Sequence, residues 1–93
     1  MKLEFTETAW EDFNYWLDQG EKTIINRIRD LITSITRTST KGLGKPEPLK
    51  HEFKGYWSRR INKGHRLVYQ VSGKRGLDQK CVIIQCRYHY DKK

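Results

Sequence analysis

The hydrophobic pattern of this chain changes its period once, and this change constrains the fold more than any other feature. Between residues 7 and 37, large apolar residues recur at helical spacing, first over 10–17 and then as six Ile and Leu residues over 24–35. From residue 49 onward, apolar and polar residues alternate instead, which is typical of strands with one buried side. The sequence therefore predicts helices in the first part of the chain and a sheet in the second.

Local signals divide these two regions into elements. Thr6 or Thr8 is a suitable N-cap for the first helix, and Gly20 is a suitable end for it. The Ser, Thr, Gly and Pro residues over Thr38–Pro48 predict a loop, and Asn62-Lys63-Gly64 predicts a tight hairpin turn. We therefore expect strands over Lys2–Thr6, Gly55–Asn62, Arg66–Ser72 and Cys81–Tyr90, helices over 7–18 and 21–37, and a longer hairpin loop over Ser72–Lys80.

The predicted fold is a single α+β domain over residues 1–93. Its two N-terminal helices form a hairpin and pack on one face of a twisted, mainly antiparallel sheet, in the order β-α-α-β-β-β. Because side chains alternate along a strand, apolar residues at every second position mark the face under the helices. By this rule the expected core positions are Trp57, Ile61, Leu67, Tyr69, Val71, Val82, Ile84, Cys86 and Tyr88, together with Trp10 and Trp16 of the first helix.

The same alternation places the polar side chains of the strands. The opposite face of the sheet collects Arg60, Arg66, Arg87 and His89. Arg59 instead shares its parity with Trp57 and Ile61, so we expect it near a sheet edge, with its stem packed and its head in water. Cys81 and Cys86 are five residues apart, which points them to opposite faces of one strand and predicts reduced, unpaired thiols.

Positive charge is concentrated in the strand-forming part of the chain. Residues 41–93 hold 14 Lys and Arg against 4 Asp and Glu, a net charge of +10. Residues 1–40 hold 5 against 7, a net charge of −2, and the two parts sum to the +8 of the whole chain. A basic region that is also rich in Tyr and Trp is typical of a surface that binds nucleic acid.

Other classes of protein are disfavoured by features that the chain lacks. Its N-terminus has no apolar signal region, and no apolar run approaches the ~20 residues that span a bilayer. We therefore expect a cytoplasmic protein without a membrane segment. No CxxC or HxxxH spacing is present, so we expect neither a metal site nor a bound cofactor.

The basic region contains the residue types that cleave RNA without a metal. In this chemistry a base removes a 2′-hydroxyl proton, the oxygen attacks the adjacent phosphorus, and an acid protonates the leaving 5′-oxygen. Glu47, held between Pro46 and Pro48, is the candidate base, and His89 is the candidate acid. Tyr90 is a candidate for stacking on a base or for sharing the acid role. The candidates for binding phosphate are Arg66, Arg60, Lys50, His51 and Arg87.

Each candidate also has an interpretation without catalysis. A lone loop carboxylate such as Glu47 is ordinarily paired with a neighbouring cation, here Lys50, and His89 is equally suited to an exposed strand end. Lys50 and His51 could be simply solvated, and we interpret His65, beside the turn glycine, as structural. The residues alone therefore leave open a non-catalytic basic module that binds RNA or the ribosome.

Four blocks of sequence carry a resemblance to a known family. In order, they are GKPEPLKH over Gly44–His51, GYWSRRI over Gly55–Ile61, HRLVY over His65–Tyr69 and CRYHY over Cys86–Tyr90. Together with Met1-Lys2-Leu3, Trp10 and Tyr15-Trp16, they closely resemble the YoeB toxins of the RelE superfamily. The resemblance covers residues 1–90, and four ordered blocks at the right spacings make it specific.

The resemblance implies a toxin of a type II toxin–antitoxin system that cleaves mRNA in the ribosomal A site without a metal, which stops translation. It implies Glu47 as the base, Arg66, His89 and Tyr90 as further catalytic residues, and Lys50 and Arg60 as supporting cations. The implied partners are the bacterial ribosome with its mRNA and a YefM-like antitoxin whose C-terminal segment covers or distorts the active site. Toxins of this kind are often dimeric, so a homodimer stays open as an alternative to a monomer.

Two features depart from the family pattern. Family members commonly end at the tyrosine that Tyr90 matches, whereas Asp91-Lys92-Lys93 follow here. The hairpin over Ser72–Lys80 is longer and more basic, so it is a candidate for an extra contact to ribosomal RNA or to the antitoxin. A third interpretation, independent of these two features, is an inactive relative that only binds an antitoxin.

Overall fold

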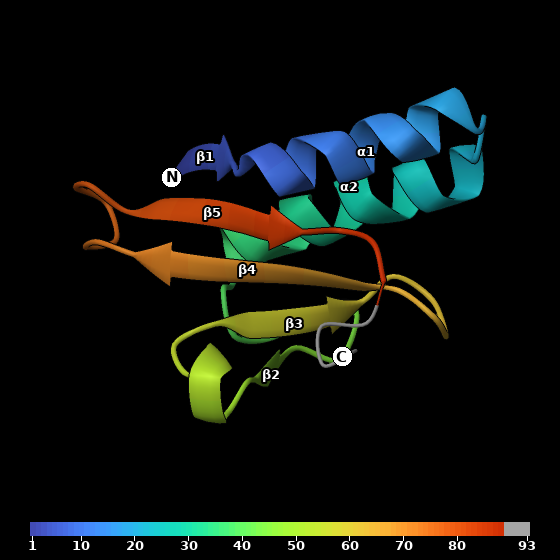
Figure 1. The fold of residues 1–93 in the computed structure, drawn as a ribbon. Helices are drawn as coiled ribbons and strands as arrows, with labels where there is room; N and C mark the ends of the chain where they lie inside the picture. Colours follow the sequence, from blue (N-terminus) through green and yellow to red (C-terminus); the bar gives the residue numbers. More distant parts are fainter. Residues whose placement is uncertain (89–93) are drawn as a thin grey trace.

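The structure is a computed structural model, and it describes residues 1–88. Its elements are β1 (Lys2–Phe5), α1 (Glu7–Asp18), α2 (Lys22–Arg37), β2 (Glu47–Pro48), a 3-10 turn (His51–Phe53), β3 (Trp57–Arg60), β4 (Arg66–Ser72) and β5 (Lys80–Gln85). This confirms the predicted α+β class, with both helices ahead of the main strands (Figure 1). Two of the predicted site residues, His89 and Tyr90, lie outside the described residues.

The helix hairpin begins and turns at the residues that the sequence indicates. The Thr6 hydroxyl caps α1 by accepting the Ala9 N–H, at 3.0 Å, and it donates to the carbonyl oxygen of Ile84, at 2.8 Å. Gly20 follows the C-cap of α1 with a φ of +67°, a left-handed conformation that glycine adopts without steric cost. Neither helix, nor any other within residues 1–88, is long and apolar enough to cross a membrane.

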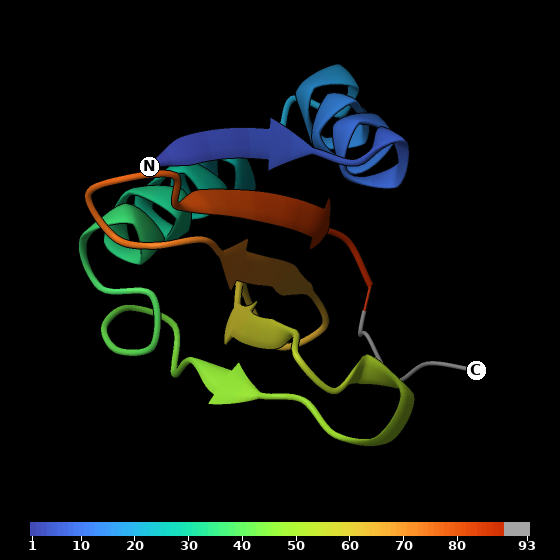
Figure 2. The ribbon, with the colours of Figure 1, turned by 90° about the vertical axis from the view of Figure 1, so that its left-hand side faces the viewer.

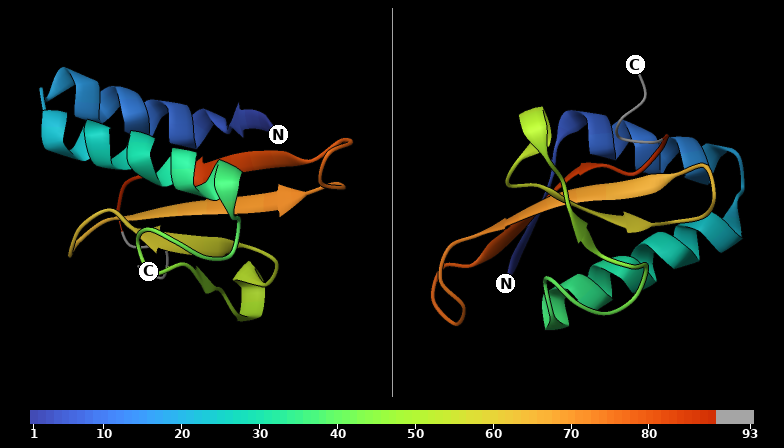
Figure 3. Two further views of the ribbon diagram at one scale, coloured as in Figure 1. Left: turned by 180° about the vertical axis from the view of Figure 1, so that it is seen from behind. Right: turned by 90° about the horizontal axis from the view of Figure 1, so that it is seen from below.

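Within residues 1–88, five strands form one mixed sheet in the order β1-β5-β4-β3-β2. β1 runs parallel to β5, and the other neighbouring pairs are antiparallel, which confirms the mainly antiparallel prediction. The helices lie over the part of the sheet formed by β1, β5 and β4, and the β2 end extends beyond them (Figures 1 and 3). Seen along the strands, the sheet twists strongly from β1 to β2 (Figure 2). The sequence predicted only loop where β2 lies, yet these two residues pair with β3 and hold Glu47 at the sheet edge.

The core lies between the helices and one face of the sheet. Ile28, Leu31 and Ile35 project from α2 onto this face, and Leu67 and Tyr69 of β4 meet them there. All five side chains are fully buried. This face of β4 is the one that the alternating pattern predicts, so the middle strand is oriented as expected.

A β-bulge interrupts the pairing of β4 with β5. The register passes from the pair Val68–Gln85 to the pair Tyr69–Ile83, so one step along β4 corresponds to two steps along β5. Ile84 is the extra residue of the bulge, and it has no partner in this register. A bulge changes which residues of a strand face each side, because each side chain position shifts by one.

The bulge makes the predicted faces of the last strand wrong. Cys81 and Ile83 are fully buried against the helices, whereas Val82 and Ile84, which were expected there, are not part of the core. Beyond the bulge, Cys86 is also fully buried in the same core. The expectation that the two cysteines lie on opposite faces is therefore wrong, although both are free thiols.

Two aromatic residues that were expected in the core are exposed. Trp10 is 56% exposed and packs edge-on against Phe5, with their ring centroids 6.3 Å apart. The inward face of α1 is formed by Ala9, Asp12 and Trp16, so Trp10 points away from it. Tyr88 is 54% exposed because β5 ends at Gln85, and the alternation of a strand no longer applies to the residues that follow.

Candidate active site

One face of the sheet collects the predicted base and two predicted phosphate ligands. Glu47 of β2 lies opposite Ser58 of β3, and Arg60 of β3 lies opposite Arg66 of β4. Directly opposed residues of antiparallel strands point to the same side, as do residues two apart on one strand. Glu47, Ser58, Arg60 and Arg66 therefore share the side of the sheet that faces away from the core, which we call the polar face.

The polar face has a buried floor and a charged rim. Ser58 and Val68 lie opposite each other on β3 and β4, and each is only 1% exposed. Glu47 and Arg60 are exposed, and Arg66 is half-buried. Small uncharged side chains thus form the centre of the face, and the titratable and cationic groups surround it.

The charges of the polar face are not neutralised within the described part of the chain. Arg60 and Arg66 lie directly opposite each other, and like charges in this arrangement destabilise a sheet. The ion pairs among residues 1–88 are Lys2–Glu4 and Lys80–Glu4, near the opposite, β1 edge of the sheet. The Glu47–Lys50 pair considered from the sequence is therefore not formed. Two adjacent cations without an acidic partner are well suited to bind a phosphate group.

The guanidinium of Arg66 is oriented by the turn that precedes β4. Its Nη1 donates to the carbonyl oxygens of Asn62, at 2.8 Å, and His65, at 3.1 Å, with a longer contact of 3.4 Å to that of Lys63. Within residues 1–88 this guanidinium makes its hydrogen bonds through Nη1, which leaves the N–H groups of Nε and Nη2 for a ligand.

Arg59 is fully buried, contrary to the expectation that its head lies in water. Its Nε donates to the Tyr69 hydroxyl, at 3.1 Å. The other four donations go from Nη1 to the Ser34 hydroxyl, at 2.7 Å, and the Leu43 carbonyl, at 3.0 Å, and from Nη2 to the carbonyls of Thr38, at 2.8 Å, and Lys41, at 2.9 Å. A guanidinium has five N–H groups, so this set of neutral oxygens, which we call the Arg59 cage, satisfies all of them.

The Arg59 cage fixes the loop that leads to Glu47. Gly44 follows the caged segment with a φ of +86°, and its carbonyl accepts the Arg60 N–H, at 2.7 Å. A Cβ at Gly44 would lie 2.6 Å from Cδ2 of Leu31 and 3.1 Å from Cβ of Arg59, so only glycine fits between the helix and β3. The position of Glu47, three residues later, is thus set by contacts in the core.

Lys50 and His51, both predicted to bind RNA, lie in the segment that follows β2. Both are exposed, and His51 has a φ of +58° at the start of the 3-10 turn. The turn is closed by the Phe53 N–H, which donates to the Lys50 carbonyl at 3.1 Å. Exposure leaves both side chains available to a polyanion beside the β2 edge.

The segment that leaves β5 is attached to α1 at Cys86. The Cys86 N–H donates to Oδ2 of Asp12, at 3.0 Å, and the Cys86 carbonyl accepts Nε1–H of Trp16, at 2.9 Å. Asp12 is 9% exposed and Trp16 5% exposed, so both bonds lie in the interior. The bond from the Cys86 N–H explains why the Asp12 carboxylate lies on the core side of α1. The sequence pattern did not reveal this role of Asp12.

Tyr88 is attached to the start of β4. Its N–H donates to Nδ1 of His65, at 2.7 Å, and its carbonyl accepts the Arg66 N–H, at 3.0 Å. We call these two bonds, with those of Asp12 and Trp16 to Cys86, the tail clamp. The clamp holds the residue that directly precedes His89 beside Arg66.

Arg87 does not join Arg60 and Arg66 on a strand, so its predicted place on the polar face through strand alternation is wrong. Its guanidinium carbon lies 3.4 Å from the ring centroid of Tyr15 in α1 and 4.4 Å from that of Tyr88. Stacking between two aromatic rings holds this cation by cation–π attraction. A role for Arg87 in binding phosphate stays a prediction.

Burial governs the titration of the groups around the tail clamp. It raises the pKa of the Asp12 carboxyl, an effect that the Cys86 N–H and Arg87 oppose. Burial lowers the pKa of His65. The charge of Arg87 lowers this pKa further, whereas the charge of Asp12 raises it. Burial also raises the pKa of Cys81 to about 11 and that of Cys86 to about 12, so neither thiol is a ready nucleophile at neutral pH.

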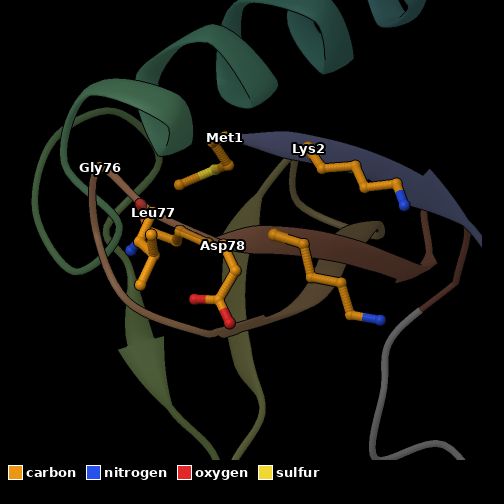
Figure 4. Close-up of a pocket in the computed structure, with 7 residues that line it drawn as sticks. Met1, Lys2, Gly76, Leu77 and Asp78 are labelled. Carbon is orange, nitrogen blue, oxygen red and sulfur yellow. The ribbon is translucent and has the colours of Figure 1, made fainter.

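Two further features of the structure bear on ligands other than RNA. Among residues 1–88, no three His, Cys, Asp or Glu side chains lie together in a way that could hold a metal ion. An open hollow of about 490 Å³ lies between the N-terminus and the β4–β5 hairpin and is lined by Met1, Lys2 and residues 76–80 (Figure 4). Because it adjoins the hairpin, it lies at the end of β4 opposite to Arg66 and is separate from the polar face.

Comparison with known proteins assigns the chain to a class. Residues 5–90 match the family described as the YoeB-like toxin of a bacterial type II toxin-antitoxin system. Toxin YoeB of Synechocystis sp. is 48% identical over 92 residues, which cover 99% of this chain and 100% of the relative. The chain is thus a toxin of a type II toxin–antitoxin system. It belongs to the YoeB family, as the four sequence blocks predicted.

Solved structures agree with this assignment. The YoeB/ParE toxin from Agrobacterium tumefaciens is 49% identical, with a TM-score of 0.91 over 97% of this chain and 100% of the other. YoeB of Staphylococcus aureus, solved as a dimer, is 42% identical with a TM-score of 0.83, over 97% of this chain and 98% of the other. A YoeB-YefM complex from Staphylococcus aureus matches with 41% identity and a TM-score of 0.82 over the same shares of the two chains.

Proposed function

We propose that this chain is a ribosome-dependent endoribonuclease that cleaves mRNA in the ribosomal A site and thereby inhibits translation. The observation that supports this most is the polar face, where the Glu47 carboxylate lies on the same side of the sheet as Arg60 and Arg66, which form no ion pair within residues 1–88. A carboxylate weakens the binding of phosphate by a basic surface. Its presence there therefore favours a role in proton transfer over a role in binding alone.

In the proposed reaction, Glu47 removes the proton of a 2′-hydroxyl group, and that oxygen attacks the adjacent phosphorus. Arg60 and Arg66 stabilise the negative charge that develops on the phosphorane oxygens. The bond from phosphorus to the 5′-oxygen breaks, and His89 donates a proton to that oxygen. The products are a 2′,3′-cyclic phosphate and a free 5′-hydroxyl. Tyr90 stacks on a base or shares the acid role, and the reaction needs neither a metal nor a cofactor.

The basic half of the chain is proposed to dock on the ribosome. Residues 41–93 carry a net charge of +10, and Lys50, His51 and Arg87 are candidates for contacts to ribosomal RNA or mRNA outside the reacting phosphate. Such contacts release counterions from the RNA, so affinity for ribosomes should fall as the salt concentration rises. Affinity that does not change with salt would contradict this mode of docking.

We further propose that a YefM-like antitoxin binds this chain and blocks its active site. The Staphylococcus aureus YoeB-YefM complex supports this, because its toxin shares the fold and 41% of the sequence. The YoeB dimer from Staphylococcus aureus supports a homodimer for this chain when the antitoxin is absent. Because the ribosome and its mRNA are the proposed targets, the proposed location is the bacterial cytoplasm.

The test is mRNA 3′-end mapping in a reconstituted translation reaction, with and without ribosomes. The wild type is compared with Glu47→Gln, which removes the base while keeping its shape, and with Glu11→Gln, which removes the same charge from an exposed position of α1. We expect cuts confined to the A site that disappear in Glu47→Gln and persist in Glu11→Gln. A wild type that binds ribosomes without cutting would overturn the proposal in favour of a non-catalytic binding module.

A further inference from the structure

The proposed mechanism does not use His65, yet this histidine holds the chain immediately before His89. The Tyr88 N–H donates to Nδ1 of His65, at 2.7 Å, and the next residue along the chain is His89. A backbone N–H can donate only to a ring nitrogen that carries a lone pair. The hydrogen bond therefore requires the neutral form of His65 with its proton on Nε2.

His65 is itself fixed by contacts on several sides. Its ring packs edge-on against Trp16, with ring centroids 4.8 Å apart and an interplanar angle of 86°. The backbone N–H of His65 donates to Oδ1 of Asn62, at 2.9 Å, and its backbone carbonyl accepts the Ile61 N–H, at 3.1 Å. Because ring and backbone are both held, the lone pair of Nδ1 points in one direction and determines where the Tyr88 N–H must lie.

Tyr88 takes a backbone conformation that needs such support. Its φ is +66°, in the left-handed region, which is unfavourable for a residue with a Cβ. Hydrogen bonds on both sides of the residue hold it there, one from its N–H to His65 and one from the Arg66 N–H to its carbonyl. Loss of the first bond removes half of this support, and the backbone of Tyr88 can then relax toward an extended conformation.

We propose that His65 is a positioning residue for the active site: its neutral imidazole holds the backbone of Tyr88, the residue that directly precedes His89, and its protonation releases Tyr88. The inference rests on the proposed function of the site. Within residues 1–88, the charged groups that act on His65 are Arg87, from the segment after β5, and Asp12 of α1, and Arg66 follows His65 at the start of β4. Arg87 and burial both lower the pKa of His65, whereas Asp12 raises it, so the balance favours the neutral form at physiological pH.

Two substitutions separate the hydrogen-bond acceptor from the ring. His65→Phe keeps a flat ring against Trp16 but has no acceptor, and we expect kcat to fall about ten- to a hundredfold, because misplacing a catalytic group by about 1 Å has effects of this size. KM should change little, since His65 does not lie on the polar face. His65→Asn offers an amide oxygen near the former position of Nδ1, and it accepts the Tyr88 N–H without titrating.

The first readout is the pH profile of ribosome-dependent cleavage between about pH 5 and 8. In the wild type, kcat should fall as the pH drops through the lowered pKa of His65. His65→Asn should recover kcat to within about threefold of the wild type at neutral pH, and it should lack the part of the acidic decline that belongs to His65. A profile of His65→Asn identical to that of the wild type would overturn the inference.

The second readout is hydrogen exchange of the Tyr88 amide by NMR, which does not depend on activity. We expect slow exchange in the wild type and in His65→Asn at neutral pH, and fast exchange in His65→Phe. Equal exchange in the wild type and in His65→Phe would overturn the inference even if cleavage is normal. If the wild type does not cleave mRNA, the proposed function fails, and the Tyr88 amide still decides whether His65 holds the chain. Thermal unfolding of each variant excludes global instability as the cause.

Discussion

The two segments that carry the proposed base and acid are anchored by different chemistry. The loop that leads to Glu47 is held by the Arg59 cage, in which a buried cation donates to five neutral oxygens. The segment that leads to His89 is held by the tail clamp, in which Asp12 and His65 each accept one backbone N–H. Arginine keeps its charge at every accessible pH. The carboxyl and imidazole groups of the clamp change their charge at or below neutrality.

This difference indicates which half of the site is rigid and which is adjustable. The hydrogen bonds of a buried guanidinium are lost together, because removing the group leaves several acceptors without donors at once. The clamp consists of single hydrogen bonds, and His65 is only half-buried. We expect loss of the Arg59 cage to cost much of the stability of the fold, and we expect the tail clamp to respond to small changes in the surroundings.

The largest expected effect comes from Arg59→Met. Methionine replaces much of the buried stem, but the oxygens of the cage lose their donors, and each orphaned buried group costs about 1–3 kcal/mol. Water can reach some of these oxygens, since Thr38, Lys41 and Leu43 lie near the surface. We expect the free energy of unfolding to fall by about 3–5 kcal/mol in urea titrations, much of the stability of a small domain.

Two matched variants sharpen this test. Arg59→Lys should recover only a small part of the loss, because an ammonium group has three donors and lacks the planar fork of arginine. Arg60→Met removes the same charge from the next, exposed residue, and its stability should stay within about 0.5 kcal/mol of the wild type. If Arg59→Met were as stable as Arg60→Met, the cage would not be what anchors the loop.

An intermediate effect is expected from Gly44→Ala, which disturbs the same loop without removing a charge. The added Cβ would lie 2.6 Å from Leu31, and the φ of +86° is unfavourable for alanine. We expect a loss of about 1–3 kcal/mol in the free energy of unfolding, together with slower mRNA cleavage, because the path of the chain to Glu47 must shift.

Gly64→Ala is the control for this substitution. No heavy atom lies within 4 Å of a Cβ at Gly64, in the turn before β4. Its stability should change by less than about 0.5 kcal/mol. Equal effects of the two substitutions would mean that the loop adapts and that Glu47 is not held through Gly44.

The parts of the fold with strong local signals were predictable from the sequence. α1 and β4 have the predicted boundaries, because a capping threonine, a terminating glycine and a regular alternation mark them. The tight turn between β3 and β4 fixes their register, which brings Arg60 opposite Arg66 on the face that alternation predicts. The placing of these two arginines on the polar face could therefore be predicted from the alternation of side chains and the length of the turn.

The errors come from interactions between distant residues. Alternation correctly placed Arg59 on the side of Trp57, but the assumption that its charge must reach water was wrong. Its acceptors come from positions 10 to 25 residues away, so no local pattern contains them. The bulge at Ile84 depends on how β5 pairs with β4, and the composition of β5 carries no mark of it. Asp12, 74 residues from Cys86, was missed for the same reason.

The smallest expected effect, and the one that separates the two anchors most directly, is the pH dependence of stability. The pKa of folded His65 is lowered, so between that pKa and about 6.5 the unfolded chain binds the proton more readily. Stability should therefore fall as the pH drops through this window. The pKa of folded Asp12 is raised above 3.8, so its contribution has the opposite sign and is lost as the pH rises through the window above 3.8.

These two contributions can be isolated by subtraction. The stability of the wild type minus that of His65→Asn should decrease on acidification below about pH 6.5, and the stability of the wild type minus that of Asp12→Asn should decrease as the pH rises above about 4. The difference between the wild type and Arg59→Met should be flat over the same range, because burial raises the pKa of Tyr69 in the cage, arginine keeps its charge and methionine has no titratable group. If the stability difference for the Arg59 cage varied with pH as steeply as those for His65 and Asp12, the two anchors would not differ. The loop to Glu47 would then be no more rigid than the segment that leads to His89.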